Sequence, residues 1–421
     1  MISTTCFFLF DVVLEIRPVV LPEVALPEVV PPEEVFLEEA CAEREFALFL
    51  FFSFFLELEV LLVRTVLFSI LRIEYQNSLD MPRLIVNFLR KSYMENMISK
   101  ILITGGLGYI GRVCQFVLAK QGYATFVIDE RPQGAQQEQV QFKQINLLQK
   151  SSIEQILQRI KPDLVLHFAA KIEVGESVQK PLYYYQNNVT GTLNLLEAMQ
   201  TWAPVPLIFL SSAAVYAPQA SPLPETALLL PQNPYGESKR MAETIISSCT
   251  DFPSVILRLF NVAGALPEQN LGENHQPETH LIPLVIQKLL RSQPVDIFGH
   301  HYPSADGTCL RDYIHVLDVS EAILASIQKL TSLSSSQSVT YNIGTGHSTS
   351  VLGVVEEVSA QLQCSPIIHW KENRSGDSAI LIADIQKARE DLLWTPAHSQ
   401  LSNIINSSIQ FQKAKMLGVC L

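Results

Sequence analysis

The stretch "ITGGLGYIGR" (residues 103–112) decides the fold, because it crowds glycines between an apolar run and a helical pattern. Gly105, Gly108 and Gly111 recur at every third position, directly after Ile101–Ile103. Glycine weakens strands and helices alike, so it is kept where backbone turns sharply or approaches another group closely. A helix N-terminus also offers unpaired N–H groups and a positive dipole end to a phosphate. On its own, the stretch fits a phosphate-binding turn and a plain strand–helix turn equally well.

The chain beyond this turn alternates between short apolar segments and helical ones. Strands are expected at residues 100–104, 124–129, 163–169, 206–212 and 254–258, and helices at 112–121, 153–160, 188–199 and 235–248. Such alternation is typical of parallel βαβ units and predicts an α/β fold built on a Rossmann-type doubly wound parallel sheet. After Arg258 the chain is richer in proline and loops, which favours a smaller C-terminal α/β substrate domain.

One acidic side chain, Asp129, ends the strand that follows the glycine turn. A carboxylate in that position accepts hydrogen bonds from a ribose 2′-hydroxyl and repels a 2′-phosphate. The alternative is that Asp129 only closes a turn at the end of the strand. In its strand–turn–helix context, the position of Asp129 predicts a dinucleotide site that prefers NAD over NADP.

A second motif, "YGESK" (residues 235–239), places Tyr235 and Lys239 on one face of a helix. A free phenol has a pKa of about 10, too high for a base at neutral pH, but a nearby ammonium and a positive nicotinamide ring both favour the phenolate. Ser212, at the end of the fourth expected strand, is placed to hydrogen-bond the same substrate hydroxyl. A lone Tyr-x-x-x-Lys is common on exposed helices, whereas this combination downstream of a nucleotide turn predicts catalysis by Ser212, Tyr235 and Lys239.

Composition narrows the choice of partners. The 421 residues carry a formal net charge of -12 without a basic run, which disfavours a nucleic-acid partner. The seven cysteines are scattered, and neither a Cys-x-x-Cys pair nor a His/Cys spacing suited to zinc occurs. We therefore expect reduced thiols, a cytoplasmic protein and no bound metal.

Residues 1–96 break with this pattern. Residues 21–35 are a short imperfect repeat of proline, glutamate and valine, and residues 47–71 are strongly apolar but contain two glutamates and an arginine. In a membrane, those charges cost about 8–10 kcal/mol, against about 6–11 kcal/mol gained from the apolar residues. This near-balance leaves a weak membrane anchor and a disordered extension both open. We favour a third interpretation, in which "MISKILITGG" marks a natural start at Met97.

Together, the motifs from Lys100 to about Pro396 resemble those of the UDP-glucose 4-epimerases, in the extended short-chain dehydrogenase/reductase family. The segments that carry the resemblance are "TGGLGYIG" (104–111), "VGESVQKPLYYYQNNVTGT" (174–192), "SSAAVY" (211–216), "NPYGESK" (233–239), "LRLFNVAGA" (257–265), "DGTCLRDYIHVLD" (306–318) and "YNIGTG" (341–346). The resemblance implies an NAD-dependent isomerase that inverts C4 of the hexose in a UDP-sugar, UDP-galactose to UDP-glucose, through a transient 4-keto intermediate. It also implies a homodimer, an NAD-binding domain over 97–258 and a nucleotide-sugar-binding domain over 259–421.

The resemblance assigns residues to both ligands, position by position. The positions that match cofactor-binding residues are Gly105, Gly108, Tyr109, Ile110 and Gly111 at the pyrophosphate, Asp129 at the adenosine ribose, Asn146 and Leu147 beside the adenine, and Phe168, Ala169, Asn187, Tyr235 and Lys239 along the rest of NAD. Asn146-Leu147 replaces a usual Asp-Ile pair, which alters that contact. The positions that match substrate-binding residues are Asn261, Arg311, Arg374 and Asp377 at UDP and Leu381 near the sugar. Surface salt bridges are the alternative role for the two arginines.

Departures from the family pattern leave the sugar open. Ile172 occupies the slot of a lysine, Leu259 replaces a tyrosine, and the bulk of residue 381 affects whether N-acetylated sugars fit. UDP-N-acetylhexosamines and UDP-uronates are therefore alternative substrates of the same reaction.

Two other classes of function compete with an epimerase. A nucleotide-sugar 4,6-dehydratase needs an acid and a carboxylate base after the catalytic hydroxyl, where this chain has Ala213 and Ala214. A non-catalytic dinucleotide sensor would have no need of the complete set Ser212, Tyr235 and Lys239. Both rivals are therefore disfavoured by the residues themselves.

Overall fold

The structure is a computed structural model, and it describes residues 98–132, 141–219, 222–373 and 378–418. The N-terminal extension over 1–96 and the expected start at Met97 lie outside the described residues, as do Arg374 and Asp377.

The strands of the main sheet are apolar along their length because both faces of the sheet are covered. In β1 (Lys100–Thr104), Ile101 and Ile103 pack into one hydrophobic core, whereas Leu102 between them packs into the other. Successive side chains of a strand point to opposite faces, so a strand buried on both sides needs an apolar residue at nearly every position. The continuous apolar runs of the sequence therefore have a direct structural cause.

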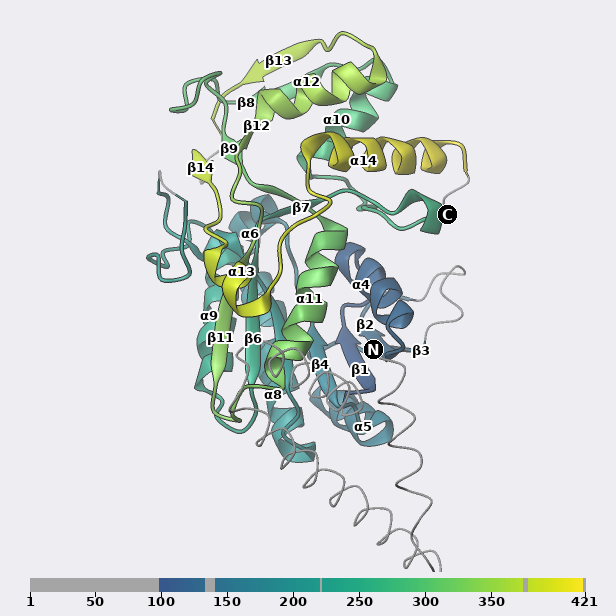
Figure 1. Cartoon of the computed structure of the whole chain (residues 1–421), viewed down its shortest axis with the longest axis vertical. Coiled ribbons are helices and arrows are strands. Elements are labelled where there is room, and N and C mark those ends of the chain that lie inside the picture. The colour runs from purple at the N-terminus through teal and green to yellow at the C-terminus, as the bar shows by residue number, and fades with distance from the viewer. Residues whose placement is uncertain (1–97, 133–140, 220–221, 374–377, 419–421) are drawn as a thin grey trace, which may run out of the picture. The chain divides into compact units, whose positions relative to one another are not determined.

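Seven parallel strands form this sheet, in the order β11-β6-β5-β4-β1-β2-β3 (Figure 1). Besides β1, they are β2 (Ala124–Asp129), β3 (Gln141–Gln144), β4 (Leu164–His167), β5 (Leu207–Ser212), β6 (Ser254–Leu259) and β11 (Ser338–Ile343). The chain builds outward from β1 to β3 and then crosses to β4 on the other side of β1. In doubly wound sheets, ligands bind at the carboxyl ends of the strands where the order reverses, which here are β1 and β4.

Helices cover the two faces separately. One core contains residues of α4 (Tyr109–Lys120), α11 (Val316–Leu330) and α13 (Gln386–Leu392). The other contains residues of α5 (Lys150–Ile160), α8 (Gly191–Trp202) and α9 (Pro234–Ser248). The segment between β4 and α8 contains α6 (Val174–Gln179), α7 (Pro181–Tyr184) and the π-helix η2 (Tyr185–Thr190). Two short 3-10 helices are η3 (Ala213–Val215) and η4 (Pro267–Gln269). The predicted Rossmann-type doubly wound sheet is confirmed.

A smaller set of elements has a core of its own. Its helices α10 (Leu281–Leu290), α12 (Val351–Leu362) and α14 (Leu401–Met416) pack on one another and lie together at one end of the sheet (Figure 1). Its strands pair as β7 (Asn261–Ala263) with β10 (Tyr313–His315), β8 (Val295–Phe298) with β13 (Ile368–Lys371), and β9 (Leu310–Arg311) between β12 (Thr349–Ser350) and β14 (Ile380–Leu381).

Two strands of the main sheet were not anticipated. β3 reads "QFKQ" and is largely exposed at the edge of the sheet, so it lacks the apolar run of a buried strand. β11 pairs with β6 at the opposite edge, although it lies eighty residues later in the chain, beyond the expected domain boundary at residue 258. The sheet thus takes its last strand from the segment assigned to the second domain.

One further property concerns the helices as a class. Within the four described ranges, none of them combines the length and the apolar character that crossing a bilayer requires.

Candidate active site

The glycine turn exists because three strand ends meet there. Gly105 has a φ of +69° and donates its N–H to the carbonyl of Ile128 at the end of β2, at 2.8 Å. A Cβ on Gly105 would lie 2.6 Å from the backbone of Ala169, just beyond β4. Gly111 is equally confined, since its Cβ would lie 2.7 Å from the Cα of Gly106. Only glycine permits β1, β2 and β4 to end this close together and α4 to begin against them.

The first turn of α4 is left open to an anion. Gly108 is its N-cap, no side chain caps the helix, and the first turn contains no acidic residue. The Tyr109 hydroxyl donates to the carbonyl of Gly264 at 2.5 Å, which anchors the start of the helix, and Ile110 beside it is partly buried. Unpaired N–H groups and a positive dipole end are what a pyrophosphate requires, so these residues fit NAD.

Asp129 lies at the edge of this turn, but it has a partner that sequence reasoning missed. Its Oδ2 accepts the N–H of Leu107 at 3.1 Å, and both of its oxygens accept hydrogen bonds from the guanidinium of Arg131, at 2.9 and 3.0 Å. Arg131 also lies over the turn, 3.6 Å from the position of a Cβ on Gly108. A ribose hydroxyl would therefore meet a carboxylate that is already paired with a half-exposed cation.

The residues expected beside the adenine form a small polar group at the ends of β2 and β3. Asn146 donates to Glu130 at 3.2 Å and accepts the N–H of Leu148 at 2.8 Å, while Leu147 packs against the second core. Lys171 pairs with the same Glu130 carboxylate. The polar group is thus held by contacts within the protein.

A buried chain of hydrogen bonds, missed by sequence reasoning, orders the end of β4. His167 lies between the hydroxyls of Thr104 at 2.8 Å and Thr192 at 2.9 Å, and Thr192 donates onward to the carbonyl of Asn188. Thr192 must then accept from His167 Nε2–H, which leaves Nδ1 to accept from Thr104. Burial, with the nearby charge of Lys239, lowers the pKa of His167 to about 3, so the imidazole stays neutral. The same Thr104 hydroxyl accepts the N–H of Ala169, which fixes the backbone after Phe168.

Of two neighbouring asparagines, the structure uses the second in this network. Asn188 is buried, donates to the Lys171 carbonyl at 2.9 Å and to the Ser238 hydroxyl at 2.9 Å, and so ties η2 to α9. Asn187, the residue expected at the cofactor, is partly buried and donates to the carbonyl of Tyr183. The π-helical turn over 185–190 sets the two side chains on different sides.

Tyr235 lies at the start of α9, against the end of β5. Asn233 caps the helix by accepting the N–H of Gly236 at 2.9 Å, and Pro234 occupies the first turn. The Tyr235 phenol is buried and lies near Ser212, whose side chain acts on the pKa of the phenol. This approach depends on Gly236, because a Cβ there would lie 2.3 Å from the carbonyl oxygen of Ala214 in η3.

The electrostatics of the pair differ from the expectation. Burial raises the pKa of the Tyr235 phenol, although the hydrogen bond with Ser212 acts to lower it. Lys239, one turn further along α9, donates to the carbonyl of Leu210 at 2.7 Å, and burial lowers its pKa to about 7 while Glu243 acts in the opposite direction. The lowering of the phenol's pKa by the ammonium, expected from sequence, is therefore wrong for the protein by itself: both groups are desolvated, and both are shifted toward their neutral forms.

A buried ion pair supports the floor of this site. Glu243 accepts from Arg258 at 2.7 Å and from Ser211, beside Ser212, at 2.5 Å. Arg258 also donates to the Tyr216 hydroxyl at 2.9 Å. The pair fixes α9 against β5 and β6, and its spacing in sequence gave no sign of it.

The expected substrate residues come together on the short strands of the smaller part. Arg311 and Leu381 are register partners in the β9–β14 pair, and Arg311 donates to the carbonyl of Ser378 at 2.7 Å. Asn261 begins β7 directly after the end of β6, the strand that pairs with β5 at Ser212. Leu381 packs against the apolar cluster that includes Ala213, next to Ser212.

Comparisons with known proteins agree with this geometry. Residues 101–344 match the NAD dependent epimerase/dehydratase family. Over 320 residues the chain is 42% identical to the UDP-glucose 4-epimerase of Rhizobium leguminosarum bv. trifolii, covering 73% of this chain and 95% of that protein. It is similar to the crystal structure of UDP-glucose 4-epimerase from Brucella ovis in complex with NAD (TM-score 0.70, 34% identity, 74% of this chain and 97% of that one). It is also similar to the Bifidobacterium longum enzyme in complex with NAD+ and UDP (TM-score 0.71, 30% identity, 76% of this chain and 100% of that one).

The close approach at Gly236 predicts a selective loss of turnover. Gly236→Ala would push α9 away from η3 and separate Tyr235 from Ser212, because the clash is with backbone. We expect turnover to fall by about 10²-fold, the usual effect of misplacing a reacting group by about 1 Å. Gly175→Ala is the control, since a Cβ there has no atom within 4 Å. Equal rates for the two variants in a steady-state assay would contradict the assignment.

The Asp129–Arg131 pair predicts how the chain distinguishes NAD from NADP. We expect wild-type protein to bind NAD far better than NADP. Asp129→Ala should reduce the ratio of the NADP and NAD dissociation constants by roughly 10–100-fold, the effect of losing a charge-assisted hydrogen bond. Arg131→Ala should increase this ratio, because the Asp129 carboxylate then faces a 2′-phosphate without the guanidinium that partly neutralises it. The measurement is the ratio of the two dissociation constants by calorimetry, and equal affinities in wild-type protein would remove Asp129 from the site.

Proposed function

Because this chain belongs to the NAD dependent epimerase/dehydratase family, we propose that Ser212, Tyr235 and Lys239 catalyse inversion of C4 in the hexose of UDP-galactose and UDP-glucose. The chain is an NAD-dependent epimerase of UDP-hexoses. One observation supports the catalytic assignment above the others. The Tyr235 phenol lies near Ser212, with Lys239 buried one turn away along α9, and these residues lie at the same end of the sheet as the glycine turn.

The residues divide the work between binding and proton transfer. We assign the pyrophosphate of NAD to the open first turn of α4 and the adenosine ribose to Asp129. Bound NAD+ supplies an acceptor for the hydride that leaves C4′ of the sugar and later returns to the opposite face. Its positive ring also favours the phenolate, which offsets the burial that raises the pKa of Tyr235. Tyr235 would take the proton of the 4′-hydroxyl as the hydride leaves and give it back to the same oxygen when the hydride returns, and Ser212 would orient that oxygen.

The two expected domains divide the ligands in this proposal. The segment 97–258 would hold NAD, and 259–421 would hold the UDP-sugar through Asn261, Arg311 and Leu381, together with Arg374 and Asp377. The two segments thus differ in the ligand that each would bind, but they share one sheet, because β11 of the second segment completes the sheet of the first.

Glucose and galactose suit the surroundings of Leu381 better than a uronic acid does. Leu381 packs against the apolar cluster that includes Ala213, and neither residue offers a cation to a uronate carboxylate. The same alanines, Ala213 and Ala214, cannot transfer protons, which leaves a 4,6-dehydratase without its acid and base. Parallel assays with UDP-galactose, UDP-N-acetylgalactosamine and UDP-galacturonate test this order, and turnover of the last two alone would overturn it.

Removal of one oxygen tests the chemistry. Tyr235→Phe should lower turnover of UDP-galactose by about 10²–10⁴-fold, the usual contribution of a general base, with NAD and UDP binding nearly unchanged. Lys239→Ala should also weaken NAD binding, because we assign that side chain to the nicotinamide ribose. The measurement is epimerisation rate alongside bound NAD. Near-normal turnover of Tyr235→Phe would direct the search to Ser212.

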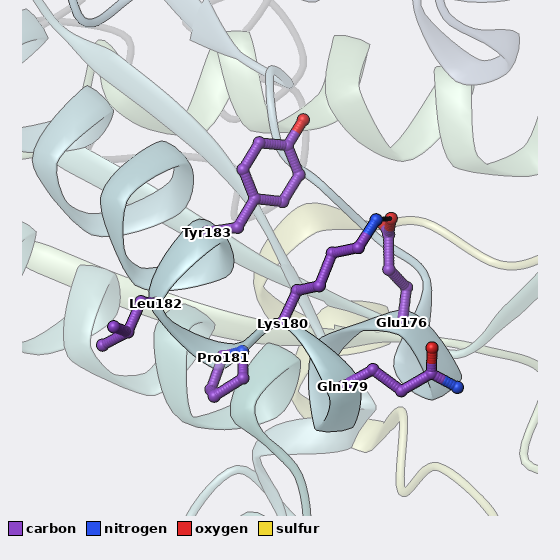
Figure 2. A pocket seen from close by; sticks show the side chains of 6 residues that line it. All are labelled: Glu176, Gln179, Lys180, Pro181, Leu182 and Tyr183. Carbon is purple, nitrogen blue, oxygen red and sulfur yellow. Dashed lines mark hydrogen bonds and ion pairs between the residues drawn. The ribbon is translucent and has the colours of Figure 1, made fainter.

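We further propose a homodimer through the surface of α6, α7, η2 and α9. This surface exposes large apolar side chains, among them Val178 at 60% and Leu182 at 80%. A hollow of about 460 Å³ lies on this surface. Figure 2 shows side chains that line it, with Lys180 bonded to Glu176 on one side and Leu182 on the other. Grouped apolar side chains around such a hollow are typical of a surface that a second copy covers.

Charge on that surface should separate the copies. Leu182→Asp should shift the protein from dimer to monomer in sedimentation velocity, because a carboxylate would be buried at the interface. Leu393→Asp is the matched control, since Leu393 is 88% exposed at the end of α13, on the other face of the sheet. Dimers that survive Leu182→Asp, or a wild-type monomer, would refute the proposed surface.

We propose the cytoplasm as the compartment. Within the described part of the chain, Cys114, Cys249 and Cys364 form no disulfide, which is typical of reducing compartments. Fractionation of cells that express the full chain tests this, and recovery with membranes would contradict it.

A further inference from the structure

The loop between η4 and α10 gathers four metal-ligating side chains that the proposed chemistry does not use. They are Glu273, His275, Glu278 and His280, in the pattern Glu-x-His-x-x-Glu-x-His. One ligand atom from each, two imidazole nitrogens and two carboxylate oxygens, lies within 4.8 Å of all the others. We call this group the loop cluster.

The distances within the loop cluster match the edges of a coordination tetrahedron. Zinc bonds nitrogen and oxygen at about 2.0–2.2 Å, which separates tetrahedral ligand atoms by roughly 3.4 Å. His275 Nδ1 lies 3.1 Å from Glu273 Oε1 and 3.8 Å from Glu278 Oε1, and His280 Nδ1 lies 3.7 Å from Glu278 Oε1. His280 Nδ1 also contacts Glu273 Oε1 directly. Small shifts would therefore seat one ion among the four atoms.

The two buried carboxylates of the loop cluster favour a bound dication. The side chains of Glu273 and Glu278 are only 8% and 5% exposed, and in the described part of the chain their ion-pair partners are the two histidines. Two buried carboxylates need two positive charges nearby. The two imidazole centroids lie 5.2 Å apart, and one dication bound between the rings and the acids would neutralise both carboxylates.

The ligand atoms are held ready by the surrounding structure. Glu278 Oε1 accepts the N–H groups of Thr279 at 2.9 Å and His280 at 3.1 Å, which fixes the carboxylate. His275 Nδ1 is buried without an aligned hydrogen bond, although Glu273 is near. A buried nitrogen that lacks an aligned hydrogen bond and lies beside a fixed carboxylate is suited to bind a metal ion.

Cations from neighbouring helices do not take the place of the ion. Arg112 of α4 donates to the carbonyl of Gly272 at 3.0 Å, and Lys415 of α14 bonds the side chain of Asn274. Both hold the same loop by groups outside the cluster. Neither of these two cations bonds the carboxylates of the loop cluster, so the carboxylates can contact the histidines or a metal ion.

Against the expectation of no bound metal, we propose that Glu273, His275, Glu278 and His280 bind one zinc ion, which fixes the loop at the start of α10. Mixed imidazole and carboxylate ligands favour zinc over magnesium or calcium, which take oxygen ligands. Four protein ligands leave no position for substrate, so the ion is structural. Thr279 donates to Glu173 at 2.5 Å, so the ion would also steady the contact between this loop and the start of α6. The proposal is independent of the catalytic assignment.

A second group of acids and histidine provides the control. Asp318, Glu321 and His398 also come together, but the Asp318 oxygens accept the N–H groups of Ala397 at 2.9 Å and His398 at 3.0 Å. His398 Nε2 lies 3.6 Å from Glu321 in this group. Asp318 therefore caps the loop before α14, and His398→Gln removes a comparable imidazole outside the loop cluster.

The test uses the full chain without a histidine tag, stripped with a chelator and then titrated with zinc. We expect one zinc per chain by mass spectrometry, a zinc-dependent rise in Tm, and the visible spectrum of tetrahedral Co²⁺ when cobalt replaces zinc. His275→Gln should weaken zinc binding at least about 100-fold, more than loss of an outer hydrogen-bond partner costs. Glu278→Gln should do the same while its amide oxygen still accepts the two N–H groups, which guards against misfolding. Wild-type protein that takes up no zinc, or equal uptake by these variants and by His398→Gln, would overturn the proposal.

Discussion

Close approach of backbone to backbone is the constraint on which the site depends. At Gly105 the end of β1 is confined by Ala169, and at Gly236 the start of α9 is confined by the carbonyl of Ala214. The first contact forms the turn that opens α4 to a pyrophosphate, and the second brings Tyr235 to Ser212. A side chain at either glycine would move a whole element, so the two reacting halves of the site are positioned by the absence of Cβ atoms.

Burial then sets the chemistry that the positioned groups can perform. The phenol of Tyr235 and the ammonium of Lys239 are both shifted toward neutral forms, since neither carries charge easily away from water. Such a pair holds its proton until a ligand changes the local field. A positive cofactor ring and a substrate hydroxyl provide that change only when both are bound, which couples proton removal to a complete site. A phenolate that formed in the free protein would lack this coupling.

The sequence predicted the elements and residues whose role follows from a local pattern, such as an apolar run or a motif spacing. It did not predict those whose role depends on neighbours in the folded structure. Buried strands such as Lys100–Thr104 were predicted because both faces of the sheet demand apolar residues. The edge strand β3 was missed because an exposed strand needs no such run. At the site, the roles of the glycines and Tyr235 follow from spacing. The pairing of Asp129 with Arg131 does not, since two residues in sequence do not reveal a side-chain direction.

Two buried carboxylates in this chain show how differently a fold can neutralise the same charge. Glu243 lies against Arg258, whose guanidinium is always charged and makes a bidentate pair, so it needs no ligand from outside. Among the described residues, the ion-pair partners of Glu273 are the imidazoles of His275 and His280, which are also side chains that bind zinc. Arginine therefore makes the first carboxylate a permanent part of the floor beneath Ser212. The second stays dependent on what the loop takes up, which is why a charge-neutralising ion is inferred at Glu273 and none at Glu243.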